Sequence, residues 1–264
     1  MDFLLAQPAK LAPWVEAVWF SAGSLERRRE RVLPTASTDI VANLGAPMRL
    51  LSGRGAERIV GTTVTGLLTR PIVLEHPLVH EAVGVRLSAH GLRAVLGVPT
   101  AAFIDQVVEL ELAVDSAVDE LVQACSRVTS PAARLDAAID WLARRLDRCA
   151  GGGDALVVWA SECIETSLGR VPIARLQRES GFSATRFNQR FRDQLGVTPK
   201  RYARLVRFRA ALDRLDPSIS LADLAHGLGY ADQAHMNRDF RSLAGCSPTA
   251  VIRNSYVSGL TIAE

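Results

Sequence analysis

Residues 173–182 read IARLQRESGF and residues 221–230 read LADLAHGLGY, and these two stretches are copies of one pattern. Residue 173 aligns with 221 and Gly181 with Gly229, an offset of 48. The following segments align at an offset of 49, which pairs Phe187, Phe191, Gly196 and Pro199 with Met236, Phe240, Gly245 and Pro248. One structural unit therefore occurs twice, and the turn in its second copy is one residue longer.

Each copy has the pattern of a short helix, a turn and a second helix. The turn contains a glycine, which permits a positive φ, and an aromatic residue, Phe182 or Tyr230, that packs between the helices. The second helix then carries two apolar side chains at positions i and i+4, which lie on one face and pack that face into the core. This arrangement is typical of helix-turn-helix units, which place their second helix in the major groove of DNA.

The second helix of each copy has an outer face opposite its apolar pair. Arg, Asn, Gln and His side chains bond to base edges, and a small Ala packs against a thymine methyl. We therefore assign six residues to base reading: Thr185, Asn188, Gln189, Ala234, His235 and Arg238. We assign five neighbours to contacts with the DNA backbone: Arg186, Arg190, Lys200, Arg201 and Gln233. The alternative is a helical hairpin repeat whose outer face is merely solvated.

The charge distribution favours DNA over that alternative. Residues 155–264 contain 15 Lys or Arg and 10 Asp or Glu, whereas residues 1–154 contain 16 and 18. The C-terminal part is therefore net positive and the N-terminal part net negative. A positive surface raises affinity for the phosphate backbone without selecting a sequence. Double-stranded DNA is accordingly the expected partner.

Residues 155–255 closely resemble the DNA-binding domain of the AraC/XylS family of transcription regulators. The resemblance rests on GYADQAHMNRDFR at residues 229–241, GCSP at 245–248 and GVTP at 196–199. It implies two helix-turn-helix units joined by a long helix that includes residues 205–215. It also implies that the two recognition helices enter successive major grooves, about 34 Å apart.

The first part of the chain, to about residue 87, has the pattern of short β-strands. Each run is rich in Val, Ile, Leu or Thr and is bounded by Gly, Pro or polar residues; the predicted strands are 15–20, 38–43, 49–51, 59–64, 72–74 and 78–87. Helices are predicted at 89–96, 113–126 and 131–148. The fold class is therefore α+β, with an N-terminal β-rich sandwich or barrel-like domain with trailing helices and a C-terminal all-α domain of two helix-turn-helix units.

Three glycines at residues 151–153 divide the chain. Because glycine has no side chain to pack, we predict a linker at 151–154, between a sensor or dimerisation domain at 1–150 and the DNA-binding domain at 155–264. Few contacts are expected to cross such a linker. The apolar stripe of helix 131–148 packs either on its own domain or on a second copy, which makes a homodimer a candidate assembly.

The N-terminal part resembles a sensor-type domain that precedes this module in actinobacterial regulators. The resemblance rests on TDIVANLG at residues 38–45, TRP at 69–71, VRL at 85–87 and LGVP at 96–99. It implies control by a small-molecule effector of unknown identity. RNA polymerase is a further candidate partner of such a regulator.

We expect no metal, cofactor or catalytic site. His76 and His80 stand beside Glu75 and Glu81, but Pro77 interrupts the segment and the close HxH pairing of a metal-binding barrel is missing. The segment at residues 53–55, GRG, is interpreted as a hairpin turn, because no Lys-Ser or Lys-Thr follows it as in a phosphate loop. No nucleophile elbow occurs, so the chain is not expected to be an enzyme.

The alternative function class is a small-molecule enzyme or binding module with a β-barrel active domain and accessory helices. The sequence has no run of about 18 apolar residues and no basic segment ahead of the apolar residues at its start. We therefore expect a cytoplasmic protein with no membrane partner. The four cysteines show no CxxC spacing and no cluster with histidine, which is typical of reduced thiols.

Overall fold

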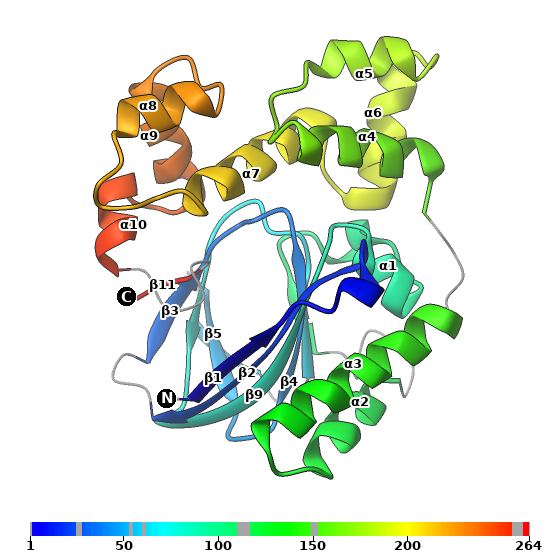
Figure 1. Cartoon of the computed structure of the whole chain (residues 1–264), viewed down its shortest axis with the longest axis vertical. Coiled ribbons are helices and arrows are strands. Elements are labelled where there is room, and N and C mark those ends of the chain that lie inside the picture. Colours follow the sequence, from blue (N-terminus) through cyan, green and yellow to red (C-terminus); the bar gives the residue numbers. More distant parts are fainter. Residues whose placement is uncertain are drawn as a thin grey trace.

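The computed structural model describes residues 2–24, 28–52, 55–59, 62–109, 117–148, 153–254 and 261–263. The fold is α+β, as predicted: strands occupy the first part of the chain and helices the second. Figure 1 shows the C-terminal helices lying across one end of the β domain. The fold therefore has a β-rich part and a helical part in the order that the sequence indicates.

A six-stranded antiparallel sheet has the strand order β1-β2-β9-β4-β7-β10. Its strands are β1 (Asp2–Ala6), β2 (Val15–Ser24), β4 (Thr38–Asn43), β7 (Thr62–Thr65), β9 (Val79–Leu87) and β10 (Val107–Glu109). Successive side chains of a strand point to opposite faces. Phe20, Ile40 and Val85 belong to a buried core that also includes residues of the neighbouring helices, so one face of this sheet is covered by helices.

The second sheet has five antiparallel strands in the order β11-β3-β8-β5-β6. They are β3 (Arg29–Val32), β5 (Met48–Ser52), β6 (Gly55–Ile59), β8 (Ile72–Glu75) and β11 (Thr261–Ala263). The ring of His76, which follows β8, lies 5.9 Å from the ring of His80 on β9. His80 lies on the face of β9 opposite the helix-covered one, so this inner face of the six-stranded sheet turns toward the second sheet.

The helices of the N-terminal part are η1 (Ala9–Leu11), α1 (Gly91–Leu96), η2 (Thr100–Phe103), α2 (Ala117–Ser126) and α3 (Pro131–Arg148). Helix α3 buries Leu135, Ala138 and Leu142 in the core that it shares with β2 and β9. Of the two interpretations of this stripe, packing on its own domain is confirmed. Dimerisation through α3 stays a prediction.

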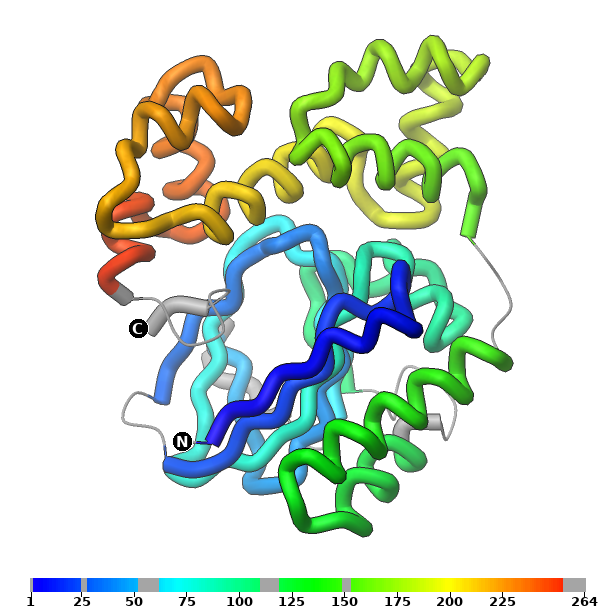
Figure 2. Tube along the Cα trace, viewed as in Figure 1, coloured from blue at the N-terminus to red at the C-terminus, as the bar shows by residue number. Residues whose placement is uncertain are grey.

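The described residues of the C-terminal part form seven helices: α4 (Ala155–Thr166), α5 (Ile173–Glu179), α6 (Ala184–Leu195), α7 (Pro199–Leu212), α8 (Leu221–Gly227), α9 (Gln233–Leu243) and α10 (Pro248–Asn254). Ser183, Thr198 and Ser220 each accept a backbone N–H at the start of a helix, as N-cap side chains do. Helix α7 crosses from the first unit to the second above the ends of the strands (Figure 2).

The expectation of few contacts across the glycine run is wrong. Leu33, Leu67 and Ala89 of the N-terminal part share one buried core with residues of α4, α6 and α7. A glycine run shows only that the connecting segment itself cannot pack, and it does not prevent the surfaces on either side from burying apolar side chains together. The two parts are therefore docked through an apolar interface.

Several strands differ from the prediction. β1, β3, β10 and β11 were not predicted. The predicted strand 59–64 covers the end of β6 and most of β7, and residues 60–61 lie outside the described residues. Residues 53–54 of the predicted hairpin turn 53–55 also lie outside the described part, and Gly55 begins β6, where it pairs with Ser52 of β5. Residues 117–126 of the predicted helix 113–126 are described, and they form helix α2.

Candidate nucleic-acid interface

The first helix-turn-helix unit consists of α5, a turn and α6. Gly181 ends the first helix with a φ of +70°, and Ser183 begins the second by accepting the N–H of Arg186. Phe187 and Phe191 are fully buried on one face of α6, and the Phe191 ring lies 5.7 Å from that of Tyr202 on α7. The predicted apolar pair therefore fixes α6 against the connecting helix.

The second unit, α8, a turn and α9, has the same construction. Gly229 has a φ of +73°, and the carboxylate of Asp232 accepts the N–H of His235 at 2.6 Å. Met236 and Phe240 are fully buried, and the Phe240 ring lies 4.9 Å from that of Phe208 on α7. The repeat in the sequence thus corresponds to a repeat in structure, with α7 as the shared support.

The six residues assigned to base reading lie on the side of α6 and α9 opposite these buried pairs. Four are exposed (Thr185, Gln189, Ala234 and Arg238), and two are half-buried (Asn188 and His235). The Gln189 amide donates to Asp193 one turn later at 2.7 Å. The ring of His235 accepts the Ala231 N–H through Nδ1, which leaves Nε2 as a donor.

The five residues assigned to the DNA backbone fall into two groups. Arg186, Lys200, Arg201 and Gln233 are exposed, each in the first turn of its helix. Arg190 is half-buried, forms an ion pair with Asp154 and lies 4.9 Å over the ring of Phe182. The structure thus gives Arg190 a role in holding α6 to the start of α4, and its role in DNA binding stays a prediction.

Two arginines of α7 connect the two units, and the sequence analysis missed both. Arg207 donates to the carbonyl of Gly169 at 2.6 Å and lies 5.4 Å over the ring of Tyr230. Arg204 pairs with Asp239 of α9 at 2.8 Å. No local signal distinguishes these residues from other arginines of a basic helix, because their hydrogen-bond partners, Asp239 and Gly169, are 35 and 38 positions away.

A polar contact supports the first unit at its base. The hydroxyl of Tyr202 donates to the carboxylate of Glu165 on α4. Burial, followed by the nearby carboxylate, raises the pKa of Tyr202 well above its usual value, so this hydroxyl stays protonated and remains a donor. The contact ties α4 to α7 beside the buried aromatic pair.

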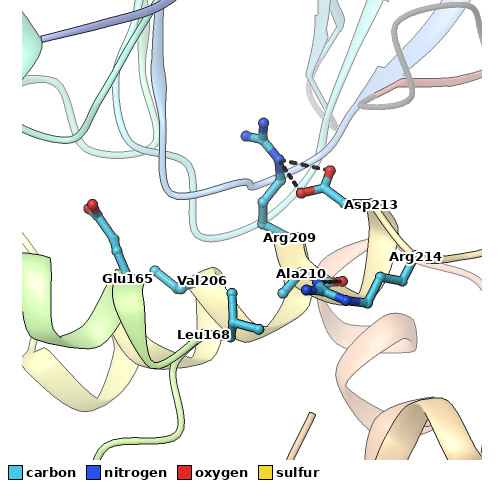
Figure 3. Close-up of a pocket in the computed structure, with 7 residues that line it drawn as sticks. All are labelled: Glu165, Leu168, Val206, Arg209, Ala210, Asp213 and Arg214. Carbon is cyan, nitrogen blue, oxygen red and sulfur yellow. Dashed lines mark hydrogen bonds and ion pairs between the residues drawn. The ribbon is translucent and has the colours of Figure 1, made fainter. Parts of the chain in front are cut away.

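A pocket of about 480 Å³ lies beside this contact; its lining is Glu165, Leu168, Val206, Arg209, Ala210, Asp213 and Arg214 (Figure 3). Arg209 extends from α7 toward the N-terminal part and pairs with Glu16 at 3.4 Å. The same guanidinium pairs with Asp213 at 3.1 Å. Arg209 therefore links the DNA-binding part to β2.

The histidines and glutamates that were weighed as metal ligands have separate protein partners. His76 pairs with Glu30 at 2.8 Å, while His80 bonds to the hydroxyl of Ser21 at 2.7 Å. Glu81 forms an ion pair with Arg134 of α3. Within the described residues, no group of three or more His, Cys, Asp or Glu side chains is placed to hold a metal ion.

Comparison with known families agrees with this geometry. Residues 176–254 match the family model described as a helix-turn-helix domain, and they extend from α5 to α10. These residues therefore belong to a helix-turn-helix domain. Residues 6–109 match the model of a domain of unknown function, which covers most of the β-rich part.

Solved structures of ToxT from Vibrio cholerae are similar in fold to the whole chain. One is 8% identical with a TM-score of 0.53 and covers 96% of this chain and 98% of ToxT. Another, ToxT with a bound unsaturated fatty acid, is 12% identical with a TM-score of 0.50 and covers 95% and 94%. A β-rich part followed by a helical part is therefore a known fold. No curated protein matches this chain in sequence.

A helix-turn-helix domain places its second helix in the major groove of DNA, which agrees with the expected DNA partner. No helix in the described part of the chain is both long enough and apolar enough to cross a membrane. The cysteines that the structure describes are free thiols: Cys125, Cys163 and Cys246.

Proposed function

We propose that this chain is a cytoplasmic transcription regulator that binds specific double-stranded DNA sites through α6 and α9, under the control of a small-molecule effector bound by its N-terminal part. One observation carries the DNA-binding half of this proposal. Two equivalent helices, α6 and α9, bury their apolar faces against the same connecting helix and leave their polar faces uncovered. Two recognition helices on one support fit successive turns of one duplex.

The chemistry of the two exposed faces supports sequence reading. Asn188 and Gln189 are amides, which bond to the N6 and N7 positions of adenine, and Arg238 matches the O6 and N7 acceptors of guanine. Ala234 is small enough for close approach to a thymine methyl. Each helix therefore presents side chains that discriminate between bases rather than only positive charge.

The start of α7 has the chemistry of a phosphate contact. Lys200 and Arg201 are exposed in its first turn, where backbone N–H groups and the helix dipole also favour an anion. Neither side chain reads a base in this proposal. They hold the duplex in register beside α6.

The inner face of the six-stranded sheet supports an effector site. Trp19 and Val41 project from this face and are only half-buried, and Asp39 pairs with Arg86 at 3.1 Å among them. Apolar surface beside a few convergent polar groups is typical of small-molecule sites. ToxT, which has this fold, has been crystallised with an unsaturated fatty acid.

Genome-wide selection of DNA fragments by the purified full-length chain tests the DNA-binding proposal. We expect the enriched fragments to share a motif with two parts one helical turn apart. The double variant Asn188→Ala with Arg238→Ala serves as control, since neither residue belongs to the buried core. No enrichment over random fragments, or the same enrichment by this variant, would contradict the proposal.

The effector proposal has its own measurement. Compounds with an apolar body, beginning with an unsaturated fatty acid, are added during binding to the selected fragment. An effector is expected to change the Kd for that fragment, and the change should be lost in Trp19→Ala. If the effector changes the Kd of Trp19→Ala as much as that of the parent chain, the effector does not bind at this face of the sheet.

A further inference from the structure

The two recognition helices end in the same way. Gly196 follows α6 with a φ of +75°, and Gly245 follows α9 with a φ of +76°. These glycines are equivalent positions of the repeat, at the offset of 49. Each lies against the N-terminal part of the chain, so both recognition helices are contacted at the same structural position.

The contact at α6 is apolar with a buried polar bond beside it. A Cβ on Gly196 would lie 2.0 Å from Cγ1 of Ile104, the residue that follows η2, so the glycine backbone is packed directly on that side chain. Nearby, the Gln194 amide donates to Nδ1 of His90 at 2.8 Å, and both side chains are buried. Burial lowers the pKa of His90 to about 4, which keeps this ring neutral and able to accept.

The contact at α9 is polar. Arg31 of β3 donates from Nη1 to the carbonyl of Ala244 at 2.8 Å, and a Cβ on Gly245 would lie 2.4 Å from the same Nη1. Strand β11, which follows α10 in the chain, pairs with β3 at this point, with Ile262 opposite Arg31. The end of α9 is therefore held by the Arg31 side chain, and β11 pairs with the strand that carries this residue.

We propose that the N-terminal part positions the two recognition helices by holding the C-terminal turn of each, with Ile104 and Arg31 as the positioning residues. Helices α6 and α9 lie near opposite ends of α7 (Figure 1), so holding the end of each would fix the separation between them. The consequence for DNA binding rests on the function proposed above, whereas the positioning of the two helices does not depend on it.

The two contacts come from different parts of the β-rich domain. Ile104 lies in the segment between η2 and β10, a strand of the six-stranded sheet, whereas Arg31 lies in β3 of the five-stranded sheet.

The competing account is that α7 alone, with Arg204 and Arg207, fixes the two units. Distance measurements without DNA separate the accounts. Nitroxide labels are attached through Arg192→Cys and Arg241→Cys, two exposed and equivalent positions on α6 and α9, in a full-length chain whose native cysteines are replaced. Pulsed electron resonance then gives the distribution of distances between the labels.

We expect one narrow distribution for the parent chain and a broader or shifted one for Arg31→Ala. Arg29→Ala is the matched control, because Arg29 lies on the same strand but pairs with Glu75 at 3.8 Å. Arg31→Lys keeps a donor and should restore the narrow distribution. An unchanged distribution in a folded Arg31→Ala would overturn the proposal, whether or not the chain binds DNA.

A second measurement uses the DNA fragment selected by the full-length chain. One base pair inserted between its two parts turns them by about a tenth of a helical turn. The parent chain should lose about tenfold in affinity on this fragment, as for a mismatch. Arg31→Ala should lose less than the parent chain, and an equal loss would show that α7 alone sets the spacing.

Discussion

Replacing Gly196 with Ala tests the packing of α6 on the N-terminal part, and Gly181 provides the comparison. Both glycines have a positive φ, +75° and +70°, in which an Ala costs about 1–2 kcal/mol. At Gly181 a Cβ would meet no atom within 4 Å, whereas at Gly196 it would lie 2.0 Å from Cγ1 of Ile104. The two variants therefore share the backbone strain and differ in the contact.

The magnitude follows from that distance. Two carbon atoms pack at about 3.5–4.0 Å, so Ile104 would have to move by about 1.5 Å or more. Overpacking of this kind costs about 1–3 kcal/mol. We expect Gly181→Ala to lower the free energy of unfolding by about 1–2 kcal/mol and Gly196→Ala by about 2–5 kcal/mol.

Urea denaturation of the full-length chain, followed by circular dichroism, measures both losses. Adding Ile104→Ala to Gly196→Ala should recover part of the difference, because the smaller side chain makes room for the new Cβ. Equal losses for the two glycine variants, or a double variant without any recovery, would refute the interface as described.

Two further predictions concern the core and the domain interface. Phe240→Ala should lower the free energy of unfolding by about 3–5 kcal/mol, because the ring is fully buried against Phe208. Tyr230→Phe should leave that free energy unchanged, since the Tyr230 hydroxyl is buried without a partner among the described residues. A normal melting temperature for Phe240→Ala would contradict the assigned core. Burial lowers the pKa of His90 from 6.5 to about 4 in the folded chain. Between pH 6.5 and pH 4 the unfolded chain therefore binds a proton at this ring that the folded chain does not bind, so the free energy of unfolding should fall as the pH drops through this range. Urea titrations at several pH values should show this fall, and His90→Gln should reduce it; an identical fall in the variant would exclude His90 as its source.

The helix-turn-helix units could be predicted because their signals are local. Glycine, aromatic residue, N-cap and the i, i+4 apolar pair all lie within about one unit of the repeat, and the structure places Phe187 and Phe240 as predicted. The base-reading residues could be placed on one helix face by the same periodicity. Their contact with DNA stays a prediction.

The parts that could not be predicted depend on distant contacts. Strand β3 reads RERV, a charged segment without a strand pattern, and it forms because β8 and β11 pair with it on both sides. The bond from Arg31 to Ala244 joins residues 213 positions apart. No local pattern carries such information, which is why the docking of the two parts was missed.

A salt titration of two arginine variants tests the reading of DNA most directly. Arg238 is exposed on α9, and Arg201 is exposed in the first turn of α7. Each is changed to Ala in the full-length chain, and affinity is measured on the selected fragment and on a scrambled duplex across a range of salt concentrations.

Arg238→Ala should lose about 1–3 kcal/mol on the selected fragment and much less on the scrambled duplex, because a guanine contact is specific. Arg201→Ala should weaken both duplexes about equally and lower the slope of log affinity against log salt by about one, as for a phosphate contact. Equal losses on both duplexes for Arg238→Ala would contradict the assignment of α9 as a helix that reads bases.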